Sequence, residues 1–164
     1  MKKLISIILT AGILLTGTMA YAEEAAGNKN GKVNAVKGFV NDVKPQLETI
    51  KENRKILNEL RQEATDLYKS TKKKINDLLK SKEEISQAQI EAVKQSVDLL
   101  VSDKKLLAET KGDIYKNSVD LKVARKAKNS EAYKAALDEI IKIQTERIKT
   151  LSKVIEDLKS IENI

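Results

Sequence analysis

The sequence predicts an all-α protein: an elongated antiparallel three-helix bundle or coiled coil after an N-terminal signal peptide. Apolar side chains recur every three or four residues over long stretches, as in a helix that lies against partner helices. Helix breakers are nearly absent after residue 46, where Gly112 is the only glycine and no proline occurs. Aromatic residues make up 3% of the chain, fewer than a β-sandwich or barrel uses.

Residues 1–22 have the organisation of a bacterial signal peptide. Lys2 and Lys3 form a charged start, a mostly apolar stretch runs to Met19, and the small-x-small sequence Ala20-Tyr21-Ala22 follows. The apolar stretch is short for a membrane span, so cleavage is expected, with an uncleaved anchor as the alternative. No cysteine follows it, so we expect a protein that is not a lipoprotein. The expected route is the general secretory pathway, to the extracellular space, the cell-wall space or the periplasm.

Residues 23–42 are expected to form a flexible leader, because glycine and asparagine are frequent in its first half. Its second half has apolar residues at helical spacing, which predicts a short helix of about 33–41. Asp42 is then a suitable N-cap for the next helix. It would place Pro45 in the first turn, where the missing N–H group does no harm. The helical bundle is expected to cover residues 43–164.

Two breaks divide the bundle into helices. Ser81 with Glu84, and Ser86 with Gln89, each fit a capping box, in which a serine hydroxyl and an acidic or amide side chain satisfy opposite backbone groups. Asn129 marks the second break. The predicted helices are about 43–80, 84–128 and 130–162.

Short connections between long helices predict an up-down-up arrangement of antiparallel neighbours. The second helix has an apolar seam and also carries Leu99 and Leu106 beside it, so we expect this helix to contact two partners. The alternative is an extended coiled coil that forms a homodimer. The seam consists of Ile90, Val93, Val97, Leu100, Lys104, Leu107, Lys111, Ile114, Ser118 and Leu121.

The residue types that most enzymes and metalloproteins need are missing. The chain has no histidine and no cysteine, which excludes most zinc, haem, copper and iron–sulfur sites and the common catalytic dyads. The acidic residues alternate with lysines at helical spacing, as on solvated helix faces. We therefore expect no catalytic site, no metal, no cofactor and no small-molecule substrate, and a protein that is not an enzyme.

Basic residues occupy positions of the apolar seams, which is unusual. If the helices pair by folding the chain at its two breaks, Arg54, Lys111 and Arg147 share one level, and Arg61 and Lys104 share another. Arginine suits carboxylate, phosphate or peptide-carbonyl partners. One interpretation is a cationic cradle on an inner or concave surface that binds a partner. Its candidate residues are Arg54, Arg61, Lys104, Lys111 and Arg147.

A purely structural interpretation is the alternative. It assigns the core of the first helix to other positions, so that Arg54 and Arg61 flank the core. Their aliphatic chains would then pack against it, while their guanidinium groups stay in water. Their heads would then lie beside Glu52, Glu63 or Glu109. The core positions in this interpretation are Leu57, Leu60, Ala64, Leu67 and Thr71.

The segment Ile85-Ser86-Gln87-Ala88-Gln89 resembles the Leu-Thr-x-x-Gln signature of the Spy-type periplasmic chaperones. This resemblance implies a small secreted helical protein that forms a cradle-shaped dimer and holds unfolded clients. The chain differs from the family pattern because Ile-Ser replaces Leu-Thr, and because no second copy of the motif is present.

Two functions are compatible with this sequence. The first is a secreted, non-enzymatic helical-bundle protein that acts as a structural or interaction module at the bacterial cell envelope. Its partner would be a protein, a second copy of the chain, or an anionic envelope polymer or lipid. The second is an ATP-independent extracytoplasmic chaperone that binds unfolded clients on a basic concave face. Nucleic acid is not an expected partner, because the net charge of +7 is modest and aromatic residues for base stacking are few.

Overall fold

The computed structural model describes residues 33–81 and 86–163. These ranges form three α-helices and no strand: α2 (Val33–Ser81), α3 (Gln87–Lys126) and α4 (Ser130–Glu162). The predicted all-α three-helix fold is therefore confirmed. The predicted signal peptide, the leader up to residue 32, and Glu84 of the first capping box lie outside the described residues.

Helix α2 is one continuous helix, and the predicted break near residue 42 is wrong. The helix passes through Pro45, and Asp42 lies inside it rather than at its N-cap. A proline removes one backbone hydrogen bond and usually bends a helix. Here the buried residues Val43 and Ile50 lie on both sides of it. Because both contact the same core, their burial holds the two halves of the helix together.

Side-chain caps begin α3 and α4. Ser86 is the N-cap of α3: its hydroxyl accepts from the backbone N–H of Gln89, and its own N–H donates to Oε1 of Gln89, 3.0 Å away. The predicted capping box of Ser86 and Gln89 is therefore present. Asn129 caps α4 in the same way through the N–H of Ala132. Between them, Lys128 takes a positive φ of 55°, which turns the chain after α3.

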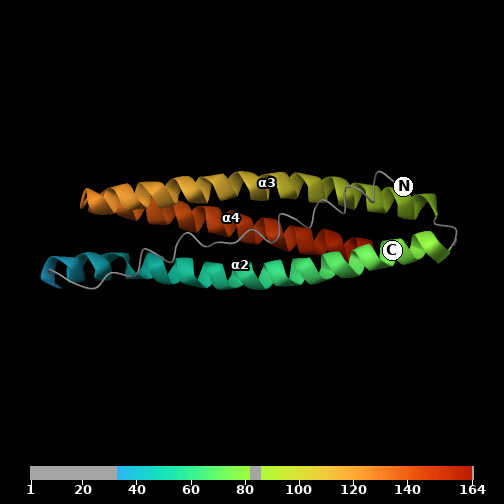
Figure 1. The fold of residues 1–164 in the computed structure, drawn as a ribbon, viewed down its shortest axis with the longest axis horizontal. Helices are drawn as coiled ribbons and strands as arrows, with labels where there is room; N and C mark the ends of the chain where they lie inside the picture. The colour runs from blue at the N-terminus through green and yellow to red at the C-terminus, as the bar shows by residue number, and fades with distance from the viewer. Residues whose placement is uncertain (1–32, 82–85, 164) are drawn as a thin grey trace.

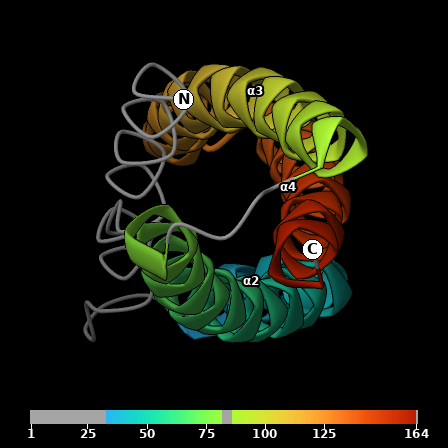
Figure 2. The ribbon, with the colours of Figure 1, turned by 90° about the vertical axis from the view of Figure 1, so that its right-hand side faces the viewer.

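Helix α4 lies between the other two helices. It packs along both α2 and α3, whereas α2 and α3 make few or no direct contacts. Seen along their length, the three helices form an arc with α4 in its middle (Figures 1 and 2). The prediction that the second helix has two partners is therefore wrong. Leu99 and Leu106, on which it rested, are 54% and 42% exposed.

The buried apolar side chains form two separate clusters. Along the helices, one cluster lies at the end of the bundle that holds the C-terminus of α4. The other lies at the opposite end, near the turn between α3 and α4. The first cluster contains Leu57, Ala64, Val97, Leu100, Leu107, Leu151, Val154, Ile155, Leu158 and Ile161. The second contains Val43, Ile50, Leu121, Ala124, Tyr133, Ala136, Leu137 and Ile140.

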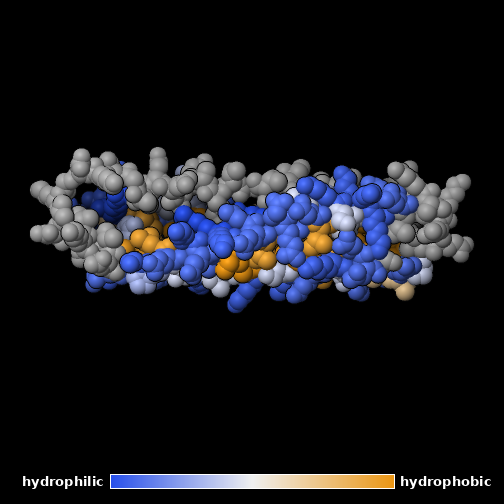
Figure 3. Space-filling view, turned by 90° about the horizontal axis from the view of Figure 1, so that it is seen from below, coloured by the Kyte–Doolittle hydropathy of each residue, from blue (hydrophilic) through white to orange (hydrophobic). Residues whose placement is uncertain are grey.

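The surface is mostly hydrophilic where it can be seen from the side of α2, with separate hydrophobic patches (Figure 3). Among the side chains of α2 from residue 42 to residue 77, Leu47 and Ile56 are the large apolar ones that are exposed. Within the described residues, no helix has an apolar stretch long enough to span a lipid bilayer.

Candidate functional site

A layer of polar side chains lies between the two apolar clusters. We call Asn53 of α2, Thr110 of α3, and Gln144 and Arg147 of α4 the polar belt. On each helix these residues fall between the positions of one cluster and the positions of the other. Gln144 is 2% exposed and Arg147 is 7% exposed, so the belt crosses the interior of the molecule. A buried polar layer of this kind needs partners for its polar atoms.

Arg147 is the centre of the belt. Its Nη1 donates to the backbone carbonyl of Leu107, 2.6 Å away, and to Oγ1 of Thr110, 2.7 Å away. Its Nε is buried and has no hydrogen-bond partner. Both acceptors are neutral, and none of the ion pairs of the described residues involves this guanidinium. Arg147 is thus a buried cation without a carboxylate.

Arg61 adds a second positive charge beside it. Burial, and then the positive charge of Arg61, together lower the pKa of Arg147 to about 10. Burial also lowers the pKa of Arg61. The Nη1 of Arg61 donates to Oδ1 of Asn58, one turn away on its own helix, over 3.5 Å. Two guanidinium groups therefore share one partly desolvated environment, which favours an anion between them.

The amides of the belt are also incompletely satisfied. Oε1 of Gln144 and Nδ2 of Asn53 are buried and have no hydrogen-bond partner. Hydrogen bonds between α2 and α4 join residues 87 to 96 positions apart, so Asn53 and Gln144 lie at the same level of the two helices. One offers a donor and the other an acceptor. These groups, with Nε of Arg147, are buried polar atoms without a hydrogen-bond partner, which is costly for the fold.

The five predicted site residues lie near the belt. Arg54 and Arg61 are half-buried on one edge of α2, Lys104 is half-buried and Lys111 is exposed on α3, and Arg147 is buried. Arg61 is the charge that acts on Arg147. The hydrogen bonds between α2 and α4, which join residues 87 to 96 positions apart, put Arg147 level with the stretch of α2 that contains Arg54.

The structural interpretation of the arginines holds in part. Leu57, Ala64 and Thr71 are fully buried, as that interpretation expects. Two of the carboxylates that it offers to the arginines have other partners. Glu63 pairs with Lys159 of α4 at 2.8 Å, and Glu109 pairs with a lysine of its own helix.

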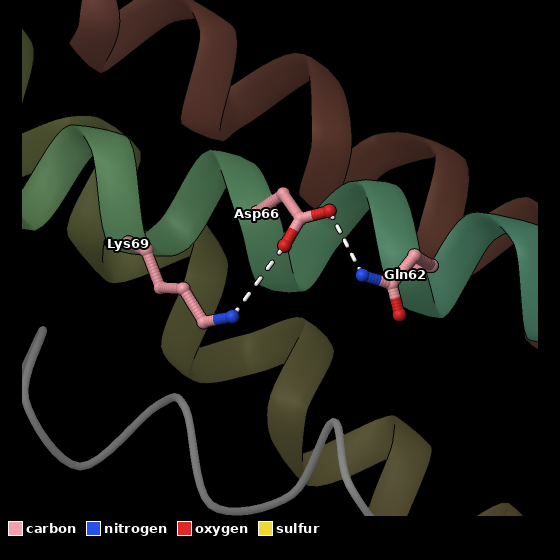
Figure 4. Close-up of polar contacts among 3 residues, drawn as sticks. All are labelled: Gln62, Asp66 and Lys69. Carbon is pink, nitrogen blue, oxygen red and sulfur yellow. Dashed lines mark hydrogen bonds and ion pairs between the residues drawn. The ribbon is translucent and has the colours of Figure 1, made fainter.

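The acidic residues of α2 lie on other sides of the helix. Asp42 and Glu63, separated by three heptads, pair with lysines of α4 on one edge. Asp66 accepts from Nε2 of Gln62 at 2.9 Å and from Nζ of Lys69 at 3.5 Å, all on the exposed surface of α2 (Figure 4). The opposite edge of α2 carries Arg54 and Arg61. Charges of opposite sign are therefore separated around this helix.

The side of the three helices that is turned to the inside of the arc has one sign of charge. On α3, Asp103 interacts electrostatically with Lys153 and Asp157 at the outer edge of α4. Lys104 is the next residue of α3 and lies further around the helix, toward the inside of the arc. We call this side the inner face, and none of its heptad positions carries Asp or Glu. They are Leu47, Arg54, Arg61, Tyr68 and Ile75 of α2, Val97, Lys104, Lys111, Ser118 and Arg125 of α3, and Tyr133, Ile140, Arg147, Val154 and Ile161 of α4.

Sequence reasoning missed Asn53, Thr110 and Gln144. For Gln144 a signal was present, because it interrupts the heptad series Leu137, Leu151 and Leu158 with a polar residue. In the part of the chain that the structure describes, no group of acidic side chains is arranged to hold a metal ion. The arrangement of the inner face suits the binding of an anionic group.

No protein-family model, curated protein or solved structure matches this chain at the threshold of the searches.

Proposed function

We propose that the protein is a secreted, non-enzymatic interaction module of the bacterial cell envelope, and that its inner face binds the partner. The observation that carries this proposal is Arg147, a buried cation that has a second arginine beside it and no carboxylate. A buried charge without a counterion is costly for a fold. Such a group is typical of a site that receives its counterion from a ligand.

The arrangement of the helices supports a binding role. Because α2 and α3 both pack on α4 and hardly contact each other, the inner face has no described helix over it. Secretion rests on the signal-peptide pattern of residues 1–22. The absence of histidine and cysteine from the chain favours a non-enzymatic role.

An ATP-independent chaperone is the second candidate. The inner face combines basic residues with the exposed or half-buried apolar residues Leu47, Tyr68 and Ile75, a mixture that can hold unfolded chains. The resemblance to the Spy-type chaperones gives the chaperone candidate less support than the motif alone suggested. Ser86 and Gln89 form a capping box, which accounts for their spacing without any role in binding.

The test measures retention of the chain that starts at Glu23, the expected mature form, by isolated bacterial envelopes. The test variant combines Arg61→Gln with Arg147→Met. The control variant combines Lys55→Gln with Lys105→Gln, because both lysines are 80% exposed and the net charge changes equally. We expect the test variant to lose retention and the control to keep it. Equal retention of both variants would exclude the inner face as the binding surface.

An aggregation assay separates the two candidates. A denatured client protein is diluted with and without the chain, at low and at moderate salt. A chaperone suppresses aggregation of unrelated clients near equimolar ratio, and the suppression weakens with salt because the inner face is cationic. An interaction module does not suppress aggregation even at several-fold excess.

A further inference from the structure

Two rows of basic residues run along the inner face, one on α2 and one on α3, which lie on either side of α4 (Figure 2). On α2, Arg54 and Arg61 lie on the edge opposite Asp42 and Glu63, the residues that pair with α4. Steps of three and four residues continue this row along the helix, and we call it the α2 rim. Its members are Lys44, Leu47, Lys51, Arg54, Asn58, Arg61, Thr65, Tyr68, Lys72 and Ile75, and all of them are exposed or half-buried.

The second row, which we call the α3 rim, has the same spacing. It continues from Lys104 on the side of α3 away from Asp103, which interacts electrostatically with α4. All of its members except Val97 are exposed or half-buried. They are Lys94, Val97, Val101, Lys104, Ala108, Lys111, Tyr115, Ser118, Lys122 and Arg125. Neither rim contains an aspartate or a glutamate, although both helices carry these residues on their other sides.

Basic residues of the two rims lie at the same levels. Residues of α2 lie beside residues of α4 that are 87 to 96 positions further along the chain, so Arg54 lies near the level of Arg147. Helix α3 runs in the opposite direction, and its Leu107 and Thr110 lie against Arg147. Arg54 and Lys111 are therefore level with each other across the inner face.

The same register gives further levels with a basic residue on each rim. Val43 and Leu121 belong to one apolar cluster. The residues directly after them, Lys44 and Lys122, therefore lie at one level. The level pairs are Lys44 with Lys122, Arg54 with Lys111, Arg61 with Lys104, and Lys72 with Lys94. Along α2 they extend over about 42 Å, at about 1.5 Å per residue.

From this pattern we propose that the inner face binds a linear phosphodiester polymer of the cell envelope, which lies lengthwise between the two rims. This inference rests on the proposed function and names the chemistry of the partner. The phosphate groups of such a polymer are part of its backbone, so their two free oxygens project to opposite sides of the polymer. One phosphate can therefore accept from a basic residue of each rim at the same level.

The middle of the inner face gives a partner little surface. Its apolar residues on α4 are buried, with Val154 at 5% and Ile161 at 2% exposed. A helix that docks by an apolar stripe needs accessible apolar surface there. Arg147, which is 7% exposed, adds positive charge near the level of Arg54 without a direct contact. A slender partner that is anionic along its length and contacts the rims fits this surface.

Three other occupants fit the rims less well. A second copy of the chain that docked by the same surface would place two rows of cations against each other, with no acidic residue in either row. Nucleic acid has the same backbone chemistry, but Tyr68 and Tyr115 are the only aromatic residues that the rims offer for base stacking. The carboxylates of an acidic polypeptide stand at the ends of side chains, so each of them reaches one rim.

The experiment uses poly(glycerol phosphate) in fractions of graded length, from monomeric glycerol phosphate to polymers longer than the rims. Isothermal titration calorimetry gives the affinity and stoichiometry of each fraction for the chain that starts at Glu23, over a range of salt concentrations. We expect one-to-one binding by fractions that span about 42 Å, and no measurable binding of the monomer at the same phosphate concentration. The affinity of the long fractions should fall steeply with salt, because the bound polymer releases counterions.

The test variant combines Lys44→Gln with Lys122→Gln, which removes one level pair. Both lysines are exposed, so the fold does not depend on them. We expect binding of the polymer to weaken at least about fivefold and to depend less on salt. The control combines Lys55→Gln with Lys105→Gln, which changes the net charge equally at two lysines that lie off the rims and are 80% exposed. In the control, the affinity should change less than about twofold.

Several results would overturn the inference. Equal weakening in the test and control variants would show that net charge alone attracts the polymer. Monomer that binds as well as the long fractions would identify an adventitious ion only. Oligothymidylate or polyglutamate of equal charge that binds at least as tightly would replace the envelope polymer as the partner. A dimer in light scattering that the test variant dissociates would identify a second copy. If envelope retention still depends on Arg61 and Arg147 while no fraction of the polymer binds, the polymer inference fails and the proposed function stands.

Discussion

Replacement of Arg147 by methionine should make the protein more stable. Burial and Arg61 lower the pKa of Arg147 from its ordinary value to about 10, so the folded state disfavours the charged form at neutral pH. At about 1.4 kcal/mol per pKa unit this shift costs about 3 kcal/mol, and about 2 kcal/mol once the remaining solvent screening is allowed for. Methionine has a similar length and fills the same space with apolar atoms.

The groups that Arg147 contacts keep partners when it is removed. Oγ1 of Thr110 also donates to the carbonyls of Leu106 and Leu107, at 2.9 Å and 3.2 Å. No buried polar group is therefore stranded by the substitution. We expect Arg147→Met to raise the free energy of unfolding by about 1 to 2 kcal/mol, and the melting temperature by about 3 to 6 °C.

Urea and thermal unfolding followed by circular dichroism measure this change. The control is Arg125→Met, because Arg125 is an exposed arginine of α3, and its effect should stay within about 0.5 kcal/mol. The difference between wild type and Arg147→Met should also shrink above pH 10. The pKa of Arg147 is lower in the folded state than in the unfolded state, so the burial cost is present below about pH 10 and is relieved as the pH rises through it. A loss of 2 kcal/mol or more in Arg147→Met would show that this arginine supports the fold, and would refute the reasoning.

Three further predictions concern the stability of the helices. Asp157→Asn should stabilise the protein at pH 7, because burial, with Asp103 and Glu156, raises the pKa of Asp157. A carboxyl with a raised pKa destabilises the folded state only while it is ionised, so the gain should vanish as the pH falls below 3.8. Urea unfolding at several pH values measures this gain. Gly112→Ala should add about 1 kcal/mol, measured by thermal unfolding, since an added Cβ meets no atom within 4 Å; no gain would mean that α3 is not a regular helix there. Ser86→Ala should cost about 1 kcal/mol by removing the N-cap of α3, and an unchanged melting temperature would argue against the cap.

The sequence predicted the helical fold well because its periodicity is strong and its breakers are few. It misjudged the start of the first helix because Asp42 and Pro45 form a valid local start signal. Burial of Val43 and Ile50 on either side of that signal outweighs it. Local capping rules do not contain this contribution of tertiary packing.

The sequence also assigned the central place to the wrong helix. The widened apolar face of the second helix rested on Leu99 and Leu106, which are exposed. The third helix has the broader apolar face, with Leu137, Ile140 and Ile141 in adjacent rows. That breadth is visible in the sequence and is the better guide to which helix has two neighbours.

The candidate site could be predicted only in outline. Seven-residue spacing put Arg54, Arg61 and Arg147 on seam positions, and the structure brings Arg61 and Arg147 together. The level at which helices pair depends on the length and path of the connection after Ser81, which periodicity does not give. The buried Nδ2 of Asn53 and Oε1 of Gln144, which have no hydrogen-bond partner, depend on that level, so they could not be foreseen.

The most direct test of the central claim compares retention of wild type and Arg147→Met by isolated envelopes at equal protein concentration. If Arg147 is present for binding, the variant is retained at least about tenfold less while it unfolds at a higher temperature than wild type. If the variant is retained as well as wild type, Arg147 has no part in binding, and the inner face is not the functional surface.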